Sequence, residues 1–294
     1  MFGRLFRWGV FLGLVGLGAF WFVTMPQSVS DGELTGLNAD AAAGQQVFTA
    51  AGCASCHAAP KAEAGAKLVL AGGQTFPSPF GTFTAPNISQ DPDHGIGGWS
   101  ASDLASAVIK GTSPNGQHYF PAFPYASYAK MTPQDAVNLH AYMQTLPADA
   151  TPSQPHDIGF PFNIRRTLGG WKMLFVSESW VLNTDDPQLQ RGRYLVEALG
   201  HCAECHTPRN ALGGLQKDNW MQGAPDPSGK GRIPGVTPAI LGWSQADIAE
   251  YLNSGFTPEF DTAGGHMVEV VENTAQLTQE DREAIAAYLM ALPN

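Results

Sequence analysis

The sequence predicts an all-α protein built from two similar helical domains that follow one apolar N-terminal helix. At 294 residues the chain is long enough for two domains of ordinary size. The same ordered features occur in residues 31–150 and again in residues 186–294, and few segments alternate apolar and polar residues as a strand does. Residues 1–30 form the expected anchor, and residues 151–185 connect the two domains.

The N-terminal region contains an uncharged run from Trp8 to Met25. As a helix, these 18 residues would be roughly 27 Å long, close to the thickness of a bilayer core. A signal peptide usually has a shorter apolar region and ends in a small-x-small cleavage site, whereas residues 22–26 read Phe-Val-Thr-Met-Pro. We therefore expect an uncleaved transmembrane helix, with a removed signal peptide as the alternative.

The charges that flank this run predict its orientation. Arg4 and Arg7 precede the run, and Asp31 and Glu33 follow it. Positively charged flanks stay on the cytoplasmic side of a membrane. In a bacterium, this places the N-terminus in the cytoplasm and the two domains in the periplasm, held at the inner membrane by a single span.

Each repeat is expected to begin and end with a helix. A glycine lies within the first helical stretch of each repeat, Gly44 in one and Gly192 in the other. Four Ser/Thr-x-x-Asp pairs predict helix N-termini, because the hydroxyl can accept from a free backbone N–H and the carboxylate suits the positive helix end. These structural pairs are Ser100/Asp103, Thr132/Asp135, Ser244/Asp247 and Thr278/Asp281.

The connection between the repeats is apolar for a linker. It starts with a proline-containing stretch and carries Phe160, Phe162, Trp171 and Phe175. Such side chains are costly to leave in water, so we expect this segment to pack between the domains.

Each repeat contains one Cys-x-x-Cys-His motif, and the two motifs hold all four cysteines of the chain. This pattern is the attachment signature of a c-type haem, in which two thioethers fix the porphyrin and the histidine ligates the iron. The sequence therefore predicts two covalently bound haem c groups and a role in electron transfer. The predicted anchors are Cys53, Cys56, Cys202 and Cys205, and the predicted iron ligands are His57 and His206.

Three other interpretations of the cysteine pairs are weaker. A redox dithiol of the thioredoxin type would occur in an α/β setting, which the sequence does not predict. Four thiolates could bind zinc, but zinc does not require a histidine directly after the second cysteine of both pairs. A disulfide across two intervening residues would close an unfavourably short loop.

The second axial ligand of each iron is predicted with unequal clarity. In the second repeat, Met267 follows Gly264-Gly265-His266 and is the expected ligand, with His266 as competitor. The corresponding stretch of the first repeat, residues 118–125, lacks methionine. Met131 is the preferred candidate there, His118 is its competitor, and an iron without a sixth protein ligand is the third possibility.

Net charge restricts the partners. The chain carries 16 basic and 26 acidic residues, a formal charge of −10, so nucleic acid is not an expected partner. An acidic surface would favour encounter with a basic face of another redox protein. The alternative is a surface that is merely solvated.

The chain resembles the multihaem cytochrome c subunits of membrane-bound bacterial dehydrogenases that oxidise alcohols, gluconate, and related sugars or aldehydes. The resemblance covers nearly all of the chain after the anchor. The motifs that carry it are Pro-Asn-Ile at 86–88, Gly-Gly-Trp-Ser at 97–100, Pro-Ala-Phe-Pro-Tyr at 121–125, Gly-His-Cys-Ala-Glu-Cys-His-Thr-Pro-Arg-Asn at 200–210, and Gly-Gly-His-Met-Val-Glu-Val-Val-Glu-Asn at 264–273.

This resemblance implies tandem class I cytochrome c domains. It also implies that Gly44 meets Tyr142, and Gly192 meets Tyr288, where the first and last helices of each domain cross. The chain departs from the family in two respects. Many relatives carry three haems, and many have a methionine ligand where this chain has Phe123.

Three functions follow as alternatives. The first is a membrane-anchored relay that takes electrons from a partner dehydrogenase and passes them to a quinone, an oxidase or a soluble cytochrome. The second is a dihaem enzyme, a peroxidase or a thiosulfate dehydrogenase, that uses an open or unusually ligated first haem. The third is an electron-transfer subunit of a respiratory oxidase assembly.

Overall fold

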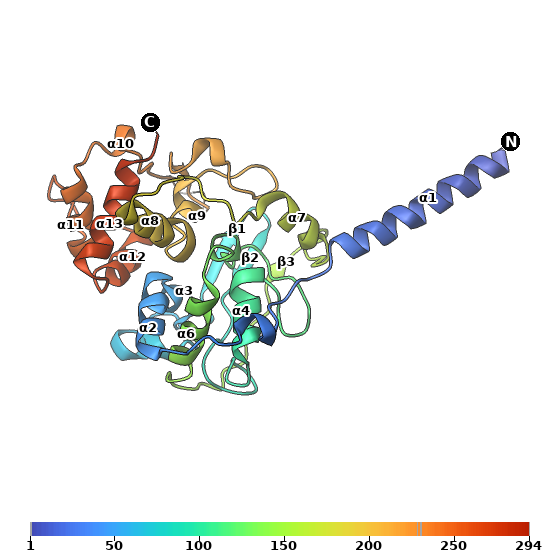
Figure 1. Ribbon diagram of the computed structural model, residues 1–294, viewed down its shortest axis with the longest axis horizontal. Coiled ribbons are helices and arrows are strands. Elements are labelled where there is room, and N and C mark those ends of the chain that lie inside the picture. The colour runs from blue at the N-terminus through green and yellow to red at the C-terminus, as the bar shows by residue number, and fades with distance from the viewer. Residues whose placement is uncertain (1, 228, 230, 294) are drawn as a thin grey trace.

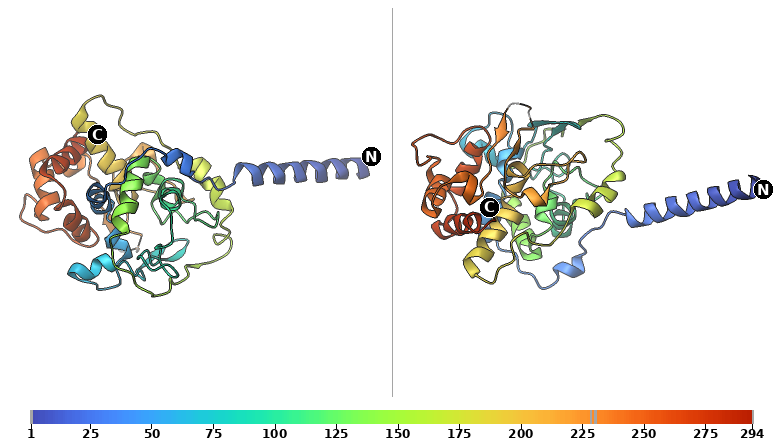
Figure 2. Two further views of the ribbon diagram at one scale, coloured as in Figure 1. Left: turned by 60° about the horizontal axis from the view of Figure 1, so that its bottom comes forward. Right: turned by 90° about the horizontal axis from the view of Figure 1, so that it is seen from above.

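The computed structural model describes residues 2–227, 229 and 231–293, so Met1 of the expected anchor lies outside the described residues. The first helix, α1 (Phe2–Val23), extends away from the body of the protein in every view (Figures 1 and 2). Every residue of α1 is exposed. Of the described helices, α1 alone is long and apolar enough to cross a membrane.

The first repeat is helical around two crossing helices, α2 (Ala41–Ala50) and α6 (Pro133–Met143). Its other elements are η1 (Asp31–Leu34), α3 (Cys53–His57), η2 (Ala64–Val69), β1 (Thr75–Ser78), β2 (Gly81–Thr84), α4 (Ala101–Lys110) and α5 (Tyr125–Tyr128).

The second repeat is built around α8 (Pro187–Arg193) and α13 (Gln279–Met290). Its remaining elements are η3 (Tyr194–Leu199), α9 (Ala203–His206), η4 (Lys217–Asn219), β4 (Ala224–Pro225), β5 (Arg232–Ile233), α10 (Pro238–Leu241), α11 (Gln245–Ser254) and α12 (Met267–Thr274). One continuous apolar core runs through both repeats.

A glycine allows the first and last helices of each repeat to touch. A Cβ atom on Gly44 would lie 1.9 Å from the backbone oxygen of Asn138 and 2.9 Å from the Cβ of Tyr142. A Cβ atom on Gly192 would lie 1.9 Å from the backbone oxygen of Ala284 and 2.9 Å from the Cβ of Tyr288. Backbone meets backbone at both crossings, as the resemblance implied.

The predicted caps begin helices as expected. The side chains of Ser100, Thr132, Ser244 and Thr278 each accept from the backbone N–H three residues later. At Thr132 the backbone N–H donates to the Tyr194 hydroxyl of the second repeat, 3.1 Å away. This cap therefore also joins the two domains.

The described part of the chain contains more strand than the sequence indicated. The strands β1, β2 and β3 (Asp157–Ile158) form a small antiparallel sheet in that order, and β4 pairs with β5. Gly81 pairs with Ile158, so the connecting segment adds the third strand to the first repeat. Such short strands carry too few residues to show an alternating pattern.

The connecting segment packs between the repeats only in part. In α7 (Thr167–Phe175), the Trp171 ring lies 6.2 Å from the ring of Tyr125, and its Nε1 donates to the backbone oxygen of Leu212 at 2.9 Å. By contrast, Phe160 is 82% exposed. The apolar linker thus has one face between the domains and another face in solvent.

Candidate haem sites at the domain interface

The first motif begins a short helix. Gly52 adopts a left-handed conformation with φ of 62°, and α3 then runs through Cys53 and Cys56 to His57. The two cysteines lie on the surface, Cys53 half-buried and Cys56 exposed. The Nδ1 atom of His57 lies 2.9 Å from the backbone oxygen of Pro86.

The second motif has the same geometry. Cys202 is half-buried and Cys205 is exposed, and α9 ends at the buried His206. The Nδ1 atom of His206 lies 2.8 Å from the backbone oxygen of Pro234.

This histidine arrangement suits an iron ligand. When Nδ1 donates to a backbone carbonyl, the ring is held in one orientation and Nε2 keeps the free lone pair. Burial lowers the pKa of His57 and of His206, which favours the neutral form that ligates a metal. The residues of both motifs therefore fit a covalently attached haem.

The competing interpretations of the cysteines find no support in the geometry. No pair of the four cysteines forms a disulfide. Within the described residues, no group of three His, Cys, Asp or Glu side chains is arranged to hold a metal ion by itself. Burial raises the pKa of Cys53 and of Cys202 to about 12, opposite to the lowered pKa of a reactive dithiol.

The predicted sixth ligand of the second repeat lies at a helix start, not in an extended loop. Met267 is the first residue of α12 and is half-buried. The neighbouring His266 is exposed and precedes the helix. Gly265, with φ of 57°, makes the turn that leads into α12.

The two first-repeat candidates lie in different surroundings. Met131 is buried in the apolar core, directly before the Thr132 cap of α6. The ring of His118 is buried elsewhere, with Nε2 3.0 Å from the backbone oxygen of Thr24 at the end of α1. Phe123 packs its ring against Tyr128 at a centroid distance of 5.8 Å.

The second cysteines of the two motifs lie near one another. Burial raises the pKa of Cys56 to about 11, and the negative charges of Glu269 and Cys205 add to this increase. Cys205 is therefore close enough to Cys56 for the charge of one thiol to affect the pKa of the other.

Each motif contacts the other domain through one hydrogen bond, and the two contacts are related by approximate two-fold symmetry. In the first motif, the Oγ atom of Ser55 accepts from the Nδ2 of Asn273 in α12 at 2.8 Å. In the second, the Oε1 of Glu204 accepts from the Oγ of Ser127 in α5 at 3.3 Å. Ser55 and Glu204 occupy the same position of their motifs.

The covering residues are equivalent as well. Ser127 lies four residues before Met131, and Asn273 lies four residues before Leu277, the counterpart of Met131. Each domain therefore contacts the motif of the other through an equivalent residue, as the two subunits of an isologous dimer do.

The segment before the second motif is one residue longer than the segment before the first. Nine positions separate Gly44 from Cys53, whereas ten separate Gly192 from Cys202. The extra residue is accommodated in η3, a π-helical turn in which Gly200 donates to the backbone oxygen of Leu195 at 2.6 Å. Such turns often mark a functional position within a helix.

His201 follows this turn and contacts the segment directly before the first motif. It has φ of 40°, at the position that Gly52 occupies in the other repeat. Its Nε2 donates to the backbone oxygen of Ala51 at 3.3 Å, and the hydroxyl of Tyr128 donates to the same oxygen at 3.2 Å. His201 therefore has a structural role at the domain interface, where it hydrogen-bonds the segment that leads into the first motif.

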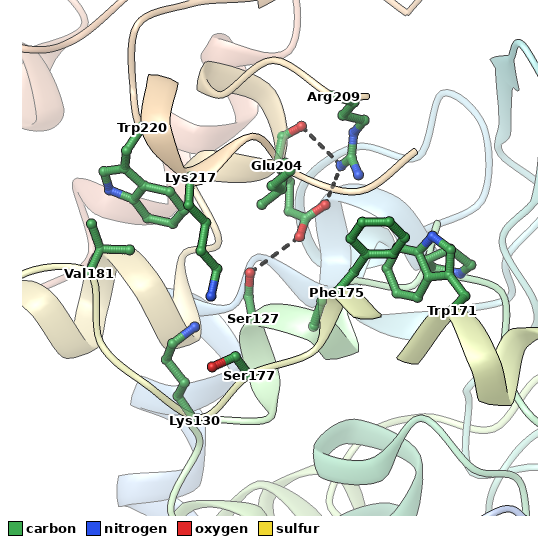
Figure 3. Close-up of a pocket in the computed structure, with 13 residues that line it drawn as sticks. Ser127, Lys130, Trp171, Phe175, Ser177, Val181, Glu204, Arg209, Lys217 and Trp220 are labelled. Atoms are coloured by element: carbon green, nitrogen blue, oxygen red, sulfur yellow. Dashed lines mark hydrogen bonds and ion pairs between the residues drawn. The ribbon is translucent and has the colours of Figure 1, made fainter. Parts of the chain in front are cut away.

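A small pocket beside the second motif is lined by side chains from both domains and from the linker (Figure 3). Arg209 forms an ion pair with Glu204, and the amines of Lys130 and Lys217 point toward one another. Burial lowers the pKa of Lys130, and the positive charge of Lys217 acts in the same direction, whereas the carboxylates of Glu197 and Glu204 oppose the shift. The pocket therefore lies at the interface between the two domains and the linker.

Comparison with known proteins decides the family. The family described as cytochrome c matches residues 41–147 and again residues 189–293. The chain belongs to the cytochrome c family. It is 55% identical over 287 residues to a diheme cytochrome c-type protein of Cereibacter sphaeroides, which covers 97% of each chain.

This cytochrome c is also similar to subunits of dehydrogenases. It is 37% identical over 260 residues to the fructose dehydrogenase cytochrome subunit of Gluconobacter japonicus, covering 85% of this chain and 52% of that subunit. It is 33% identical over 276 residues to the cytochrome c subunit of the quinone alcohol dehydrogenase of Gluconobacter oxydans, covering 85% and 54%. The chain thus spans about half the length of these two subunits.

These findings confirm the predicted resemblance and the fold of two cytochrome c domains after an apolar helix. Cytochrome c domains bind haem c covalently and transfer electrons, as the sequence predicted. The sequence patterns did not reveal that the carbonyls of Pro86 and Pro234 orient the two motif histidines. They also did not reveal the contacts of Ser127 and Asn273 across the interface. Pro86 lies within a family motif, but a motif does not reveal that its backbone oxygen is the functional atom.

Proposed function

We propose that this cytochrome c is a membrane-anchored dihaem relay that takes electrons from a partner dehydrogenase and delivers them to the respiratory chain. The observation that carries the proposal is the domain interface, where each Cys-x-x-Cys-His motif is hydrogen-bonded to a helix of the other domain. A relay needs its two redox groups close together, and this interface brings their attachment points together. The similarity to dehydrogenase cytochrome subunits supports a dehydrogenase as donor.

Four thiols and two imidazoles would hold the cofactors. Cys53 and Cys56 would form the thioethers of the first haem, and Cys202 and Cys205 those of the second. Each haem c supplies one Fe(III)/Fe(II) couple when bound. The carbonyls of Pro86 and Pro234 orient His57 and His206, so that each Nε2 can serve as a ligand.

The sixth ligands would be Met267 in the second domain and Met131 in the first. Met131 is buried two residues before α6, and its backbone N–H donates to the backbone oxygen of Tyr128 at 2.8 Å. The hydroxyl of Tyr128 in turn donates to the backbone oxygen of Ala51, two residues before Cys53. His118 is already engaged with Thr24, and Arg165 donates to its backbone oxygen at 2.9 Å. Moving His118 to the motif would break both contacts.

The anchor and the domain boundaries complete the proposal. Residues 1–30 would anchor the chain in the inner membrane, with α1 as the single span and Arg4 on the cytoplasmic side. Residues 31–150 and 186–294 would form the periplasmic haem domains, joined by residues 151–185. The acceptor would be a quinone, an oxidase or a soluble cytochrome.

Affinity purification of the full-length, C-terminally tagged protein from its native membranes tests the donor. We expect a dehydrogenase catalytic subunit to copurify, and its substrate to reduce both haems in the isolated complex. Copurification with oxidase subunits alone would favour the oxidase-assembly alternative. A high-spin first haem with peroxidase or thiosulfate-oxidising activity would favour the dihaem enzyme instead.

A further inference from the structure

The end of α1 is clamped to the connecting segment, not free of the body. A Cβ atom on Gly169 would lie 2.5 Å from the backbone oxygen of Thr24, so α7 and the end of α1 are in direct contact. The guanidinium of Arg166 stacks on the ring of Trp21 at 4.1 Å and donates to its backbone oxygen. Figure 1 shows α7 at the corner of the body from which α1 extends, and both views of Figure 2 agree.

Beside this clamp, the linker exposes apolar side chains that the fold does not cover. We call these five residues the linker patch. Their exposed fractions are 82% for Phe160, 47% for Phe162, 42% for Ile164, 60% for Met173 and 71% for Leu174. On α7, Met173 and Leu174 are four residues after Gly169 and Gly170, so they continue the helix face that touches α1.

This segment is positively charged, whereas the chain as a whole is negatively charged. Although the net charge is −10, residues 158–177 contain Arg165, Arg166 and Lys172 and no acidic residue. The three cations are half-buried, and Lys172 donates to the backbone oxygens of Lys110 and Gly111. The exposed surface of the segment is therefore apolar and carries no negative charge to repel anionic lipid, as suits the interface of a bilayer.

We propose that the linker patch lies in the outer interface of the bilayer and binds lipid beside α1. The inference rests on the proposed anchor, because α1 defines where the membrane begins. It goes further by fixing the body at two places, through the end of α1 and through the patch. The haem domains would then be held in one orientation toward the membrane instead of swinging on a tether.

Photo-cross-linking in vesicles tests this docking. The full-length holoprotein is reconstituted in phosphatidylcholine and phosphatidylglycerol vesicles that contain a diazirine-tagged lipid, and the adducts are mapped by mass spectrometry. We expect adducts in α1 and in residues 160–174, and none in α11. Adducts in α1 alone would overturn the docking but leave the anchor intact, whereas their absence from α1 would overturn the anchor and the docking together.

A matched pair of variants sharpens the test. Phe160→Ser combined with Leu174→Ser should reduce the adducts in residues 160–174 by about tenfold, because two apolar side chains that enter the bilayer are lost. Phe260→Ser removes an 89% exposed phenylalanine from the second domain and should leave the adduct pattern unchanged. Equal loss in both variants, or no loss in the first, would contradict the proposal.

Discussion

The Nε2 of His201 lies 3.3 Å from the backbone oxygen of Ala51, so the residue before the second Cys-x-x-Cys-His motif touches the residue two positions before the first. This contact spans the domain interface within a few residues of both predicted haem attachments. It is formed by a histidine in the left-handed region, where the first repeat has Gly52. A non-glycine residue with this conformation carries strain, which the interface must offset.

Two substitutions of His201 separate strain from contact. His201→Gly removes the hydrogen bond but also relieves the backbone, so we expect the free energy of unfolding to change by less than about 1 kcal/mol. His201→Ala removes the bond and keeps the strain, and should lower the free energy of unfolding by about 1–2 kcal/mol. Urea denaturation monitored by far-UV circular dichroism measures both. Equal destabilisation in the two variants would show that the left-handed backbone is not strained.

The helix crossings predict a large effect of a single methyl group. Gly44→Ala or Gly192→Ala would place a Cβ atom 1.9 Å from a backbone oxygen, and the helices would have to separate. We expect each change to lower the free energy of unfolding by about 3 kcal/mol or more, measured by thermal and urea denaturation. Gly98→Ala is the control, since its nearest atom would be 3.8 Å away, and it should leave stability nearly unchanged.

Ligation of the first haem distinguishes Met131 from His118. Met131→Ala should convert this haem from a low-spin to a high-spin spectrum and lower its potential, because a sixth ligand is lost. His118→Gln should leave the spectrum unchanged, because the ring of His118 is engaged with Thr24. Electron paramagnetic resonance of the oxidised protein reports the spin state. A high-spin signal in the His118 variant alone would reverse the assignment.

Met267 should govern the potential of one haem only. Met267→Ala is expected to lower the potential of the second haem by on the order of 0.1 V, a fraction of the range that axial ligands set. The first haem should keep its potential. Spectroelectrochemical titration resolves the two couples, and Met173→Ala, which removes a 60% exposed methionine, is the control. Movement of both potentials, or of neither, would contradict the assignment.

The buried His118 should make stability depend on acid pH. Burial lowers its pKa in the folded protein. The hydrogen bond to Thr24 opposes this shift, and the neighbouring charges of Lys172 and Arg166 add to it. In the unfolded chain it titrates near pH ~6.5. The unfolded state therefore binds more protons below that pH, so the stability that neutral His118 contributes is present above pH ~6.5 and falls as the pH drops.

His118→Gln tests this dependence, because glutamine can donate to Thr24 and does not titrate. The free energy of unfolding of the parent should exceed that of the variant by less at pH 5 than at pH 8. Urea denaturation at the two pH values measures the difference, in which the contributions of the other histidines cancel. A difference that does not change with pH would show that the His118 ring is not held neutral.

Features that depend on near neighbours in the chain could be predicted from the amino-acid sequence. The Ser/Thr-x-x-Asp pairs begin helices because a cap and its N–H lie three residues apart. The Cys-x-x-Cys-His motifs predict the cofactor because five consecutive residues contain the whole signature. The apolar run of α1 was equally visible, since length and composition alone define it.

The contacts between these parts follow from the packing of the folded chain. Pro86 and Pro234 supply carbonyls whose direction no side-chain pattern encodes, and Ser127 meets Glu204 across 77 residues of sequence. His118 looked like a possible ligand until packing placed it against Thr24, 94 residues away. Contacts between distant segments depend on the summed packing of whole domains, which no local pattern contains.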